Sequence, residues 1–211
     1  MAYPTNPAPA SLFPPARPRG GLAGRLIAAL LRPPVTGRIA AFERRYRYRM
    51  DYARQLYDAS PAAFWQLAKL FGIAGGVPGL SPAMLVAAKF AATRREDCGP
   101  CAQLVLDLAL EAGVPAAALR ALVAGDATAM PEDMRLAWRY AEAALARDPE
   151  SETHARALGE RLGPQAVAGV ALALSVARTF PTLKYALGHG RSCQRLVVGA
   201  DNAGGGEAQT R

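Results

Sequence analysis

Apolar residues return every three or four positions along most of this chain, which is the period of an α-helix. The first long segment of this kind begins near Arg38. Its apolar positions, which keep returning to one side of a helix, are Ile39, Phe42, Tyr46, Ala53, Leu56 and Tyr57. Arginines occupy most of the other side. The pattern therefore predicts a helix that packs through its apolar face and has a basic opposite face.

Local start and stop signals divide the rest of the chain into further helices. Ser60-Pro61 and Ser81-Pro82 each combine an N-cap residue with proline at the first helical position. Gly113-Val-Pro115 is a typical helix stop. Helices are expected at 61–71, 82–95, from the cysteines near 98 to 112, 116–124, 131–147, 151–162 and 164–178. In the helix after Cys98, the expected buried side consists of Cys101, Leu104, Val105, Leu108 and Ala112.

The two ends of the chain differ from this helical pattern. Prolines crowd the first 34 residues, and each one removes a backbone donor, so residues 1–20 are expected to be disordered or extended. A short helix is expected at 21–31. The domain organisation inferred is a Pro/Arg-rich tail at 1–37, a helical domain at 38–198 and a Gly-rich flexible tail at 199–211.

Composition favours an all-α fold. Apolar residues make up 51% of the chain and aromatics only 7%, and alanine dominates, which suits close-packed helices better than a β-sandwich. The longest apolar runs are shorter than the roughly 20 residues of a spanning helix, so no membrane span is expected. Three cysteines are too few for a disulfide scaffold, which favours a reducing, cytoplasmic location.

The net charge of +8 is concentrated near the N-terminus. Residues 1–60 contain ten arginines against three acidic residues, a net charge of +7. Such a region can bind an acidic partner or lipid, but no nucleic-acid recognition motif accompanies it. We therefore interpret it first as a solvated helix face and do not expect a nucleic-acid partner.

The most informative motif is Cys98-Gly-Pro-Cys101. Asp97 is a good N-cap, so the first cysteine is expected in the opening turn of a helix, where free amide groups and the helix dipole stabilise a thiolate. Three-residue spacing puts both sulfurs on one side of the turn, where a disulfide opens and closes without backbone rearrangement. The pair can thus store two electrons.

Two other interpretations of the cysteines remain open. They can be inert core residues, because free cysteine is often a small buried hydrophobe. They can also join His189 and Cys193, which form an H-x-x-x-C pattern, in a Cys3His zinc site. Because about 90 residues separate the two halves, only tertiary proximity would assemble that site.

Residues 89–115, KFAATRREDCGPCAQLVLDLALEAGVP, resemble the core of the alkylhydroperoxidase D/carboxymuconolactone decarboxylase family. The resemblance extends over about residues 60–185, with its core at 82–146. It implies an all-helical bundle that assembles into homo-oligomers and, in the peroxidase branch, a redox-active cysteine pair. It also implies that Cys101 is the peroxide-reactive thiol and Cys98 the resolving one, whereas helix-terminus physics favours Cys98 as the nucleophile.

This chain departs from the peroxidase branch at two positions. The branch has a histidine four residues after the second cysteine and a glutamate about twelve before the first, and here these positions hold Val105 and Val86. When the peroxide bond breaks, the departing hydroxide needs a proton donor. Valine cannot donate a proton, so neither position fills this role. Glu96 is the candidate replacement, although a solvated or dipole-pairing role also suits it. Asp107 is expected to face another helix or solvent.

The remaining polar candidates are assigned structural roles. His154 is expected at the surface and His189 in a loop, while Lys184 and Tyr185 are expected to be a helix-surface and a packing residue respectively.

We therefore predict a thiol-dependent peroxidase or disulfide oxidoreductase, with Cys98, Cys101 and Glu96 as catalytic residues. Its partners are a peroxide or protein disulfide substrate and an external thiol reductant, and no metal or other cofactor is expected. The alternatives are a non-enzymatic helical interaction protein with structural or zinc-binding cysteines, and a cofactor-free decarboxylase-like member of the same family.

Overall fold

The computed structural model describes residues 22–75, 80–190 and 196–199, and over these residues the chain is all-α. The helices are α1 (Leu22–Tyr46), α2 (Asp51–Ala59), α3 (Pro61–Gly75), α4 (Pro82–Arg95), α5 (Gly99–Glu111), α6 (Ala116–Ala124), α7 (Glu132–Ala146), α8 (Ser151–Leu162) and α9 (Pro164–Ala186). The predicted fold class, an all-α multi-helix bundle, is confirmed. The tails expected at 1–20 and 200–211 lie outside the described residues.

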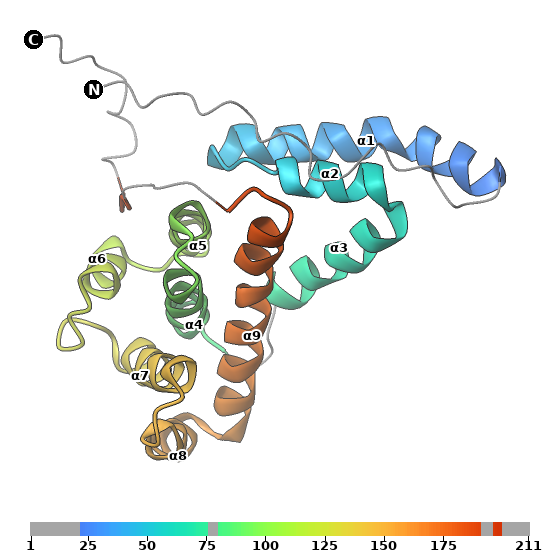
Figure 1. Ribbon diagram of the computed structural model, residues 1–211. Coiled ribbons are helices and arrows are strands. Elements are labelled where there is room, and N and C mark those ends of the chain that lie inside the picture. The colour runs from blue at the N-terminus through green and yellow to red at the C-terminus, as the bar shows by residue number, and fades with distance from the viewer. Residues whose placement is uncertain (1–21, 76–79, 191–195, 200–211) are drawn as a thin grey trace, which may run out of the picture.

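Helix α4 is the centre of the larger core. It packs against α5, α7 and α9, and Figure 1 shows these helices around it. Its fully buried alanines at 87, 88, 91 and 92 have no large side chains, so neighbouring helices approach closely. The same core extends to α6 and α8 through Leu119, Leu122 and Leu158.

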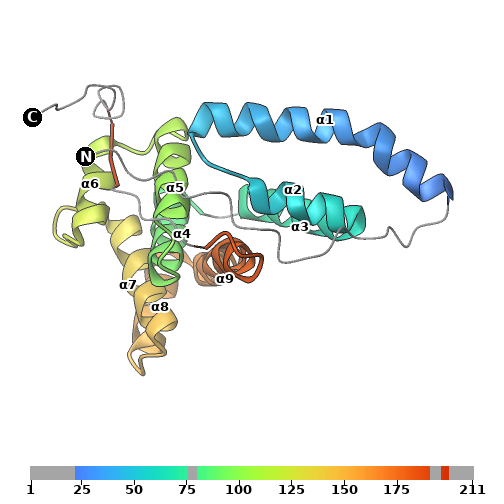
Figure 2. The same cartoon turned by 45° about the horizontal axis from the view of Figure 1, so that its top comes forward.

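A second apolar cluster joins α1, α2 and α3 to the rest of the molecule. Helix α9 lies between the two groups, with α4 and α5 on one side and α3 on the other (Figures 1 and 2). The cluster is formed mainly by residues of the first three helices, and Cys98 and Cys101 belong to it as well. The cysteine pair therefore lies where the two helical groups meet.

The N-terminal helices differ from the predicted ones in two ways. The segments expected at 21–31 and from 38 onward form one continuous helix, α1, which runs through Pro33 and Pro34, so the expected boundary between residues 37 and 38 falls inside it. The packing helix expected to continue to Tyr57 instead breaks after Tyr46. Arg47 adopts φ 49°, and the amide of Met50 donates to Glu43 Oε1 at 2.7 Å. This carboxylate satisfies a free amide at the start of α2 and stabilises the break.

Most later boundaries agree with the predicted ones, but α9 continues to Ala186, past the expected end at 178. Pro181 lies inside α9 and is buried, so packing compensates for the backbone hydrogen bond that a proline cannot donate. The predicted buried side of α5 is partly wrong, because Leu108 is 40% exposed while Leu106 and Ala109 are buried.

Helix α9 is also long and apolar enough, by length and composition alone, to cross a bilayer. The same measures are met by core helices of soluble proteins. In this structure α9 packs against α3, α4, α7 and α8. No second helix of this kind occurs in the described part of the chain.

The N-cap of α4 joins two distant helices. Ser81 Oγ accepts from the amide of Met84 at 3.2 Å and also donates to the carboxylate of Asp133 in the first turn of α7. Ser81→Ala is expected to lower the free energy of unfolding by about 1 to 2 kcal/mol, measured by urea denaturation. The matched control is Ser60→Ala, because Ser60 Oγ caps α3 through Ala63 alone. An equal loss in both variants would show that the bond to Asp133 contributes nothing.

Candidate functional site

The turn between α4 and α5 holds the cysteine pair in place. The amide of Cys98 donates to Thr93 O at 3.1 Å, and the amide of Asp97 donates to Arg94 O at 3.0 Å, so the end of α4 anchors the turn. Asp97 adopts φ 51°, and Cys98 is the N-cap of α5. The expected N-cap, Asp97, is therefore wrong by one residue, because Asp97 takes the left-handed conformation that reverses the chain.

Cys98 and Cys101 form a disulfide across the first turn of α5, with Cα atoms 5.2 Å apart. Gly99 and Pro100 fill the positions between them, where proline has no intrahelical acceptor to lose. The exposed fractions of the two residues are 7% and 4%. Both sulfurs thus lie on one side of the first turn, as the three-residue spacing predicts, and both residues are almost completely buried.

Tyr48 covers one sulfur. Its hydroxyl lies 3.6 Å from Cys101 Sγ and shares a hydrogen bond with the hydroxyl of Tyr52. Burial raises the pKa of Tyr48 well above its usual value and that of Tyr52 to about 12, so both phenols keep their protons. A reduced Cys101 would therefore face a neutral hydroxyl that can donate a hydrogen bond to it.

Lys184 brings a cation to both sulfurs. Its Nζ lies 3.8 Å from Cys98 Sγ and 4.0 Å from Cys101 Sγ, and 4.9 Å from the centre of the Tyr48 ring. The residue is only 5% exposed, and desolvation lowers the pKa of its amine to about 8, although the carboxylate of Asp51 opposes this shift. A buried amine with such a pKa gains and loses its proton near neutral pH.

The sequence-based assignments of Lys184 and Tyr185 are both wrong. Lys184 is buried against the disulfide, whereas Tyr185 is 76% exposed. The spacing of α9 could have predicted that Lys184 is buried. Lys184 continues the helical stripe of buried residues formed by Ala173, Ala177 and Pro181. Tyr48 had no such signal, since it lies in the short break between α1 and α2 and meets Cys101 only through tertiary packing.

Glu96, the third predicted catalytic residue, binds α9. Its Oε1 accepts from Arg178 Nε at 2.6 Å. Thr182 Oγ1 lies 3.4 Å from its Oε2 but has a nearer acceptor in Arg178 O at 2.8 Å. These contacts hold the turn that carries Cys98 against α9. The ion pair with Arg178 favours a structural role for Glu96, and Lys184, whose Nζ lies within 4.0 Å of both sulfurs, is the better placed group for proton transfer.

The other sequence candidates lie in structural positions. Asp107 accepts from Gln103 Nε2 at 2.8 Å. Val86 is buried in the larger core, and Val105 packs against that core. His154 is half-buried on α8.

His189, one half of the suggested zinc pattern, pairs with a glutamine. Its Nε2 lies 2.6 Å from Gln55 Oε1, and burial lowers its pKa, which disfavours the charged imidazolium. Cys193, the other half, lies outside the described residues. Among the residues whose placement is given, no group of three or more His, Cys, Asp or Glu side chains is arranged to hold a metal ion.

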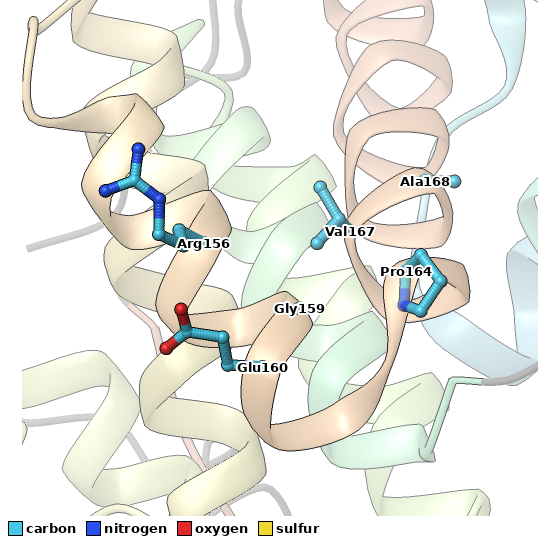
Figure 3. Close-up of a pocket in the computed structure, with 6 residues that line it drawn as sticks. All are labelled: Arg156, Gly159, Glu160, Pro164, Val167 and Ala168. Carbon is cyan, nitrogen blue, oxygen red and sulfur yellow. The ribbon is translucent and has the colours of Figure 1, made fainter.

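Two surface hollows lie away from the disulfide. An open hollow of about 550 Å³ lies between α8 and α9, where Figure 3 shows Val167 pointing toward α8 and Arg156 and Glu160 leaving α8 on the side away from α9. A hollow of about 320 Å³ between α4, α6 and α7 is lined by Arg94, Arg95, Trp138 and Glu142, among others. Neither brings a nucleophile together with an activating group.

No family model, curated protein or solved structure matches this chain. The family resemblance of residues 89–115 therefore stays a prediction, and inference about function rests first on the geometry around the disulfide.

Proposed function

We propose that this chain is a thiol-dependent oxidoreductase whose Cys98/Cys101 pair cycles between dithiol and disulfide to reduce hydroperoxides. The single observation that supports it best is Lys184, which lies within 4.0 Å of both sulfurs. A cation at that distance lowers the pKa of a thiol and so raises the fraction of reactive thiolate. The resemblance of residues 89–115 to the peroxidase branch favours the same chemistry.

An inert structural pair would be served better by an apolar neighbour. Burying an ammonium group beside a disulfide, which is neutral, costs free energy that an apolar side chain of similar size would not cost. In the reduced state the same ammonium faces a negative thiolate. The free-energy cost of burying the ammonium is therefore offset only when the cysteines are reduced. A redox-active pair is reduced in every cycle, whereas a structural cross-link stays oxidised.

The reaction starts from a thiolate beside the Lys184 ammonium ion, a pair that forms when the neutral fraction of the amine, present because its pKa is only about 8, takes up the thiol proton. The thiolate attacks the terminal, hydrogen-bearing oxygen of R–O–O–H, the O–O bond breaks with RO⁻ departing, and the sulfur is oxidised to a sulfenic acid. The departing alkoxide takes the proton back from Lys184 and leaves as an alcohol. The second thiol then attacks the sulfenic sulfur, the S–S bond forms, and water is released.

Two equivalents of an external thiol close the cycle by reducing the disulfide, and are themselves oxidised to a disulfide. The burial of both sulfurs favours a small hydroperoxide over a protein disulfide as oxidant, because a protein disulfide must approach in line with an exposed sulfur. A small-molecule thiol suits the reducing step for the same reason.

The direct test is thiol counting on the protein with Cys193→Ser, which removes the third cysteine. Two thiols should disappear on addition of stoichiometric hydrogen peroxide and return with dithiothreitol, and the protein should then consume peroxide over many turnovers with dithiothreitol as reductant. Thiols that stay unreactive, or stoichiometric zinc by elemental analysis of the unsubstituted chain, would instead support a helical interaction protein with structural or metal-binding cysteines.

A further inference from the structure

Helix α1 projects beyond the rest of the bundle. Figures 1 and 2 both show its N-terminal half running past the ends of α2 and α3. On this half, Leu26 is 65% exposed and Leu30 is 77% exposed. Leucines at i and i+4 lie on one face of a helix, so these two exposed side chains form an apolar ridge.

This ridge lies on the face opposite the core. Val35 and Ile39 are buried and mark the inward side of α1. At 100° per residue, the outward side contains a series of positions that are exposed in the structure: Leu26, Leu30, Pro33, Gly37, Ala41 and Arg44. The outward face therefore carries Leu26 and Leu30 toward the N-terminal end of the helix and Arg44 toward its C-terminal end.

The basic end contains arginines that the fold does not use. Three arginines of this region form ion pairs, namely Arg32 with Asp58, Arg45 with Glu111 and Arg49 with Asp51. The exposed Arg38, Arg44 and Arg47 have no ion-pair partner in the part of the chain that the structure describes. The one acidic residue of α1, Glu43, is bound to Arg54. Arg44 lies on the outward face, Arg38 is about 100° around the helix from it, and Arg47 follows the last residue of α1, so the unpaired charges on and beside this face are all positive.

We propose that the outward face of α1 docks on an anionic lipid surface, with α1 lying parallel to the membrane plane. Leu26 and Leu30 insert at the boundary between headgroups and acyl chains. Arg44 on the same face, and Arg38 and Arg47 beside it, reach lipid phosphates with their long side chains. A protruding helical ridge is convex. A folded protein would need a matching groove to cover it, whereas a bilayer deforms around inserted side chains.

Lipid docking is independent of the cysteine chemistry, because Leu26 and Leu30 belong to neither the disulfide cluster nor the contacts of Lys184. The test is co-sedimentation of the full chain with vesicles of phosphatidylcholine alone and of phosphatidylcholine containing phosphatidylserine. Binding is expected to the anionic vesicles and to fall as salt is raised, because salt screens the attraction between arginines and headgroups. The double variant Leu26→Ser/Leu30→Ser should bind at least about tenfold more weakly.

The matched control is Leu162→Ser, an exposed leucine at the end of α8, remote from α1 in Figure 1. It should bind like the unsubstituted chain, and both leucine variants should keep its unfolding midpoint and its peroxide turnover. Equal binding to neutral and anionic vesicles, no binding to either, or an equal loss in the control would each overturn the proposal. So would a change in oligomeric state on size exclusion for the α1 variant alone, since the face would then be an interface between copies.

Discussion

Cys98→Ser and Cys101→Ser are each expected to abolish disulfide formation and to lower multiple-turnover peroxide reduction, the variant without the attacking sulfur to the background rate. A remaining nucleophile is oxidised to a sulfenic acid that has no second cysteine to resolve it, so without an external thiol the reaction stops after one event. Peroxide consumption with dithiothreitol as reductant measures the loss, again in the background of Cys193→Ser. The reactive thiol of dithiothreitol can attack the sulfenic acid directly, so the assay also needs a single-turnover experiment without reductant.

The two variants also identify the attacking sulfur. The variant that keeps the nucleophile should consume one equivalent of peroxide and be trapped as a sulfenic acid by a dimedone-type reagent, seen by mass spectrometry. Helix-terminus physics favours Cys98 for this role, while the family resemblance and the hydroxyl of Tyr48 favour Cys101. Turnover unchanged in both variants would refute a dithiol mechanism.

Lys184→Met is expected to slow the reaction and to stabilise the oxidised protein. Without the ammonium group the attacking thiol should have a higher pKa, and each unit of that rise lowers the thiolate fraction, and so the rate, by about tenfold. Methionine has a similar length and fills the same space without a buried charge. The pH dependence of alkylation by iodoacetamide reports the thiol pKa and separates an electrostatic role from a structural one.

The stability effect of Lys184 should depend on pH in a defined direction. Burial lowers the pKa of the amine from 10.5 to about 8 in the disulfide form. Below pH 8 the folded and unfolded states both carry the proton, so the full cost of the buried cation, of the order of 3 kcal/mol, is present. Between about pH 8 and 10 the folded state loses the proton first, and stability should rise with pH.

Urea denaturation of the oxidised protein at pH 7 and at pH 10 checks this expectation. Lys184→Met should be more stable than the unsubstituted protein at pH 7, and the difference should shrink toward pH 10. The control is Lys89→Met, because burial also lowers the pKa of Lys89, which lies in the middle of α4 and away from the cysteine turn at its end. Lys89→Met should leave the thiol pKa unchanged. If Lys184→Met and Lys89→Met shifted the thiol pKa equally, the proposed specific effect of Lys184 on the thiol would be refuted.

Local signals in the sequence predicted much of the helical framework. Ser60-Pro61, Ser81-Pro82 and Gly113-Val-Pro115 marked helix ends that the structure confirms, because caps and stops act through backbone groups only a few residues away. The placement of both cysteines in the first turn of a helix was predictable for the same reason. Prolines misled the prediction at α1 and at Pro181, where packing sustains helices that local propensity would end.

Tertiary structure alone decided what surrounds the cysteines. Tyr48 lies 53 residues before Cys101, and Lys184 lies 86 after Cys98, so no local pattern connects them to the turn. Glu96 is two residues from Cys98 in sequence, yet its carboxylate binds Arg178, 82 residues away. The sequence by itself determined that two sulfurs share one helical turn, because three-residue spacing is a local property. The packing of α9 and of the break after α1 decided that a buried ammonium and a phenol face those sulfurs, because such contacts depend on how distant helices meet.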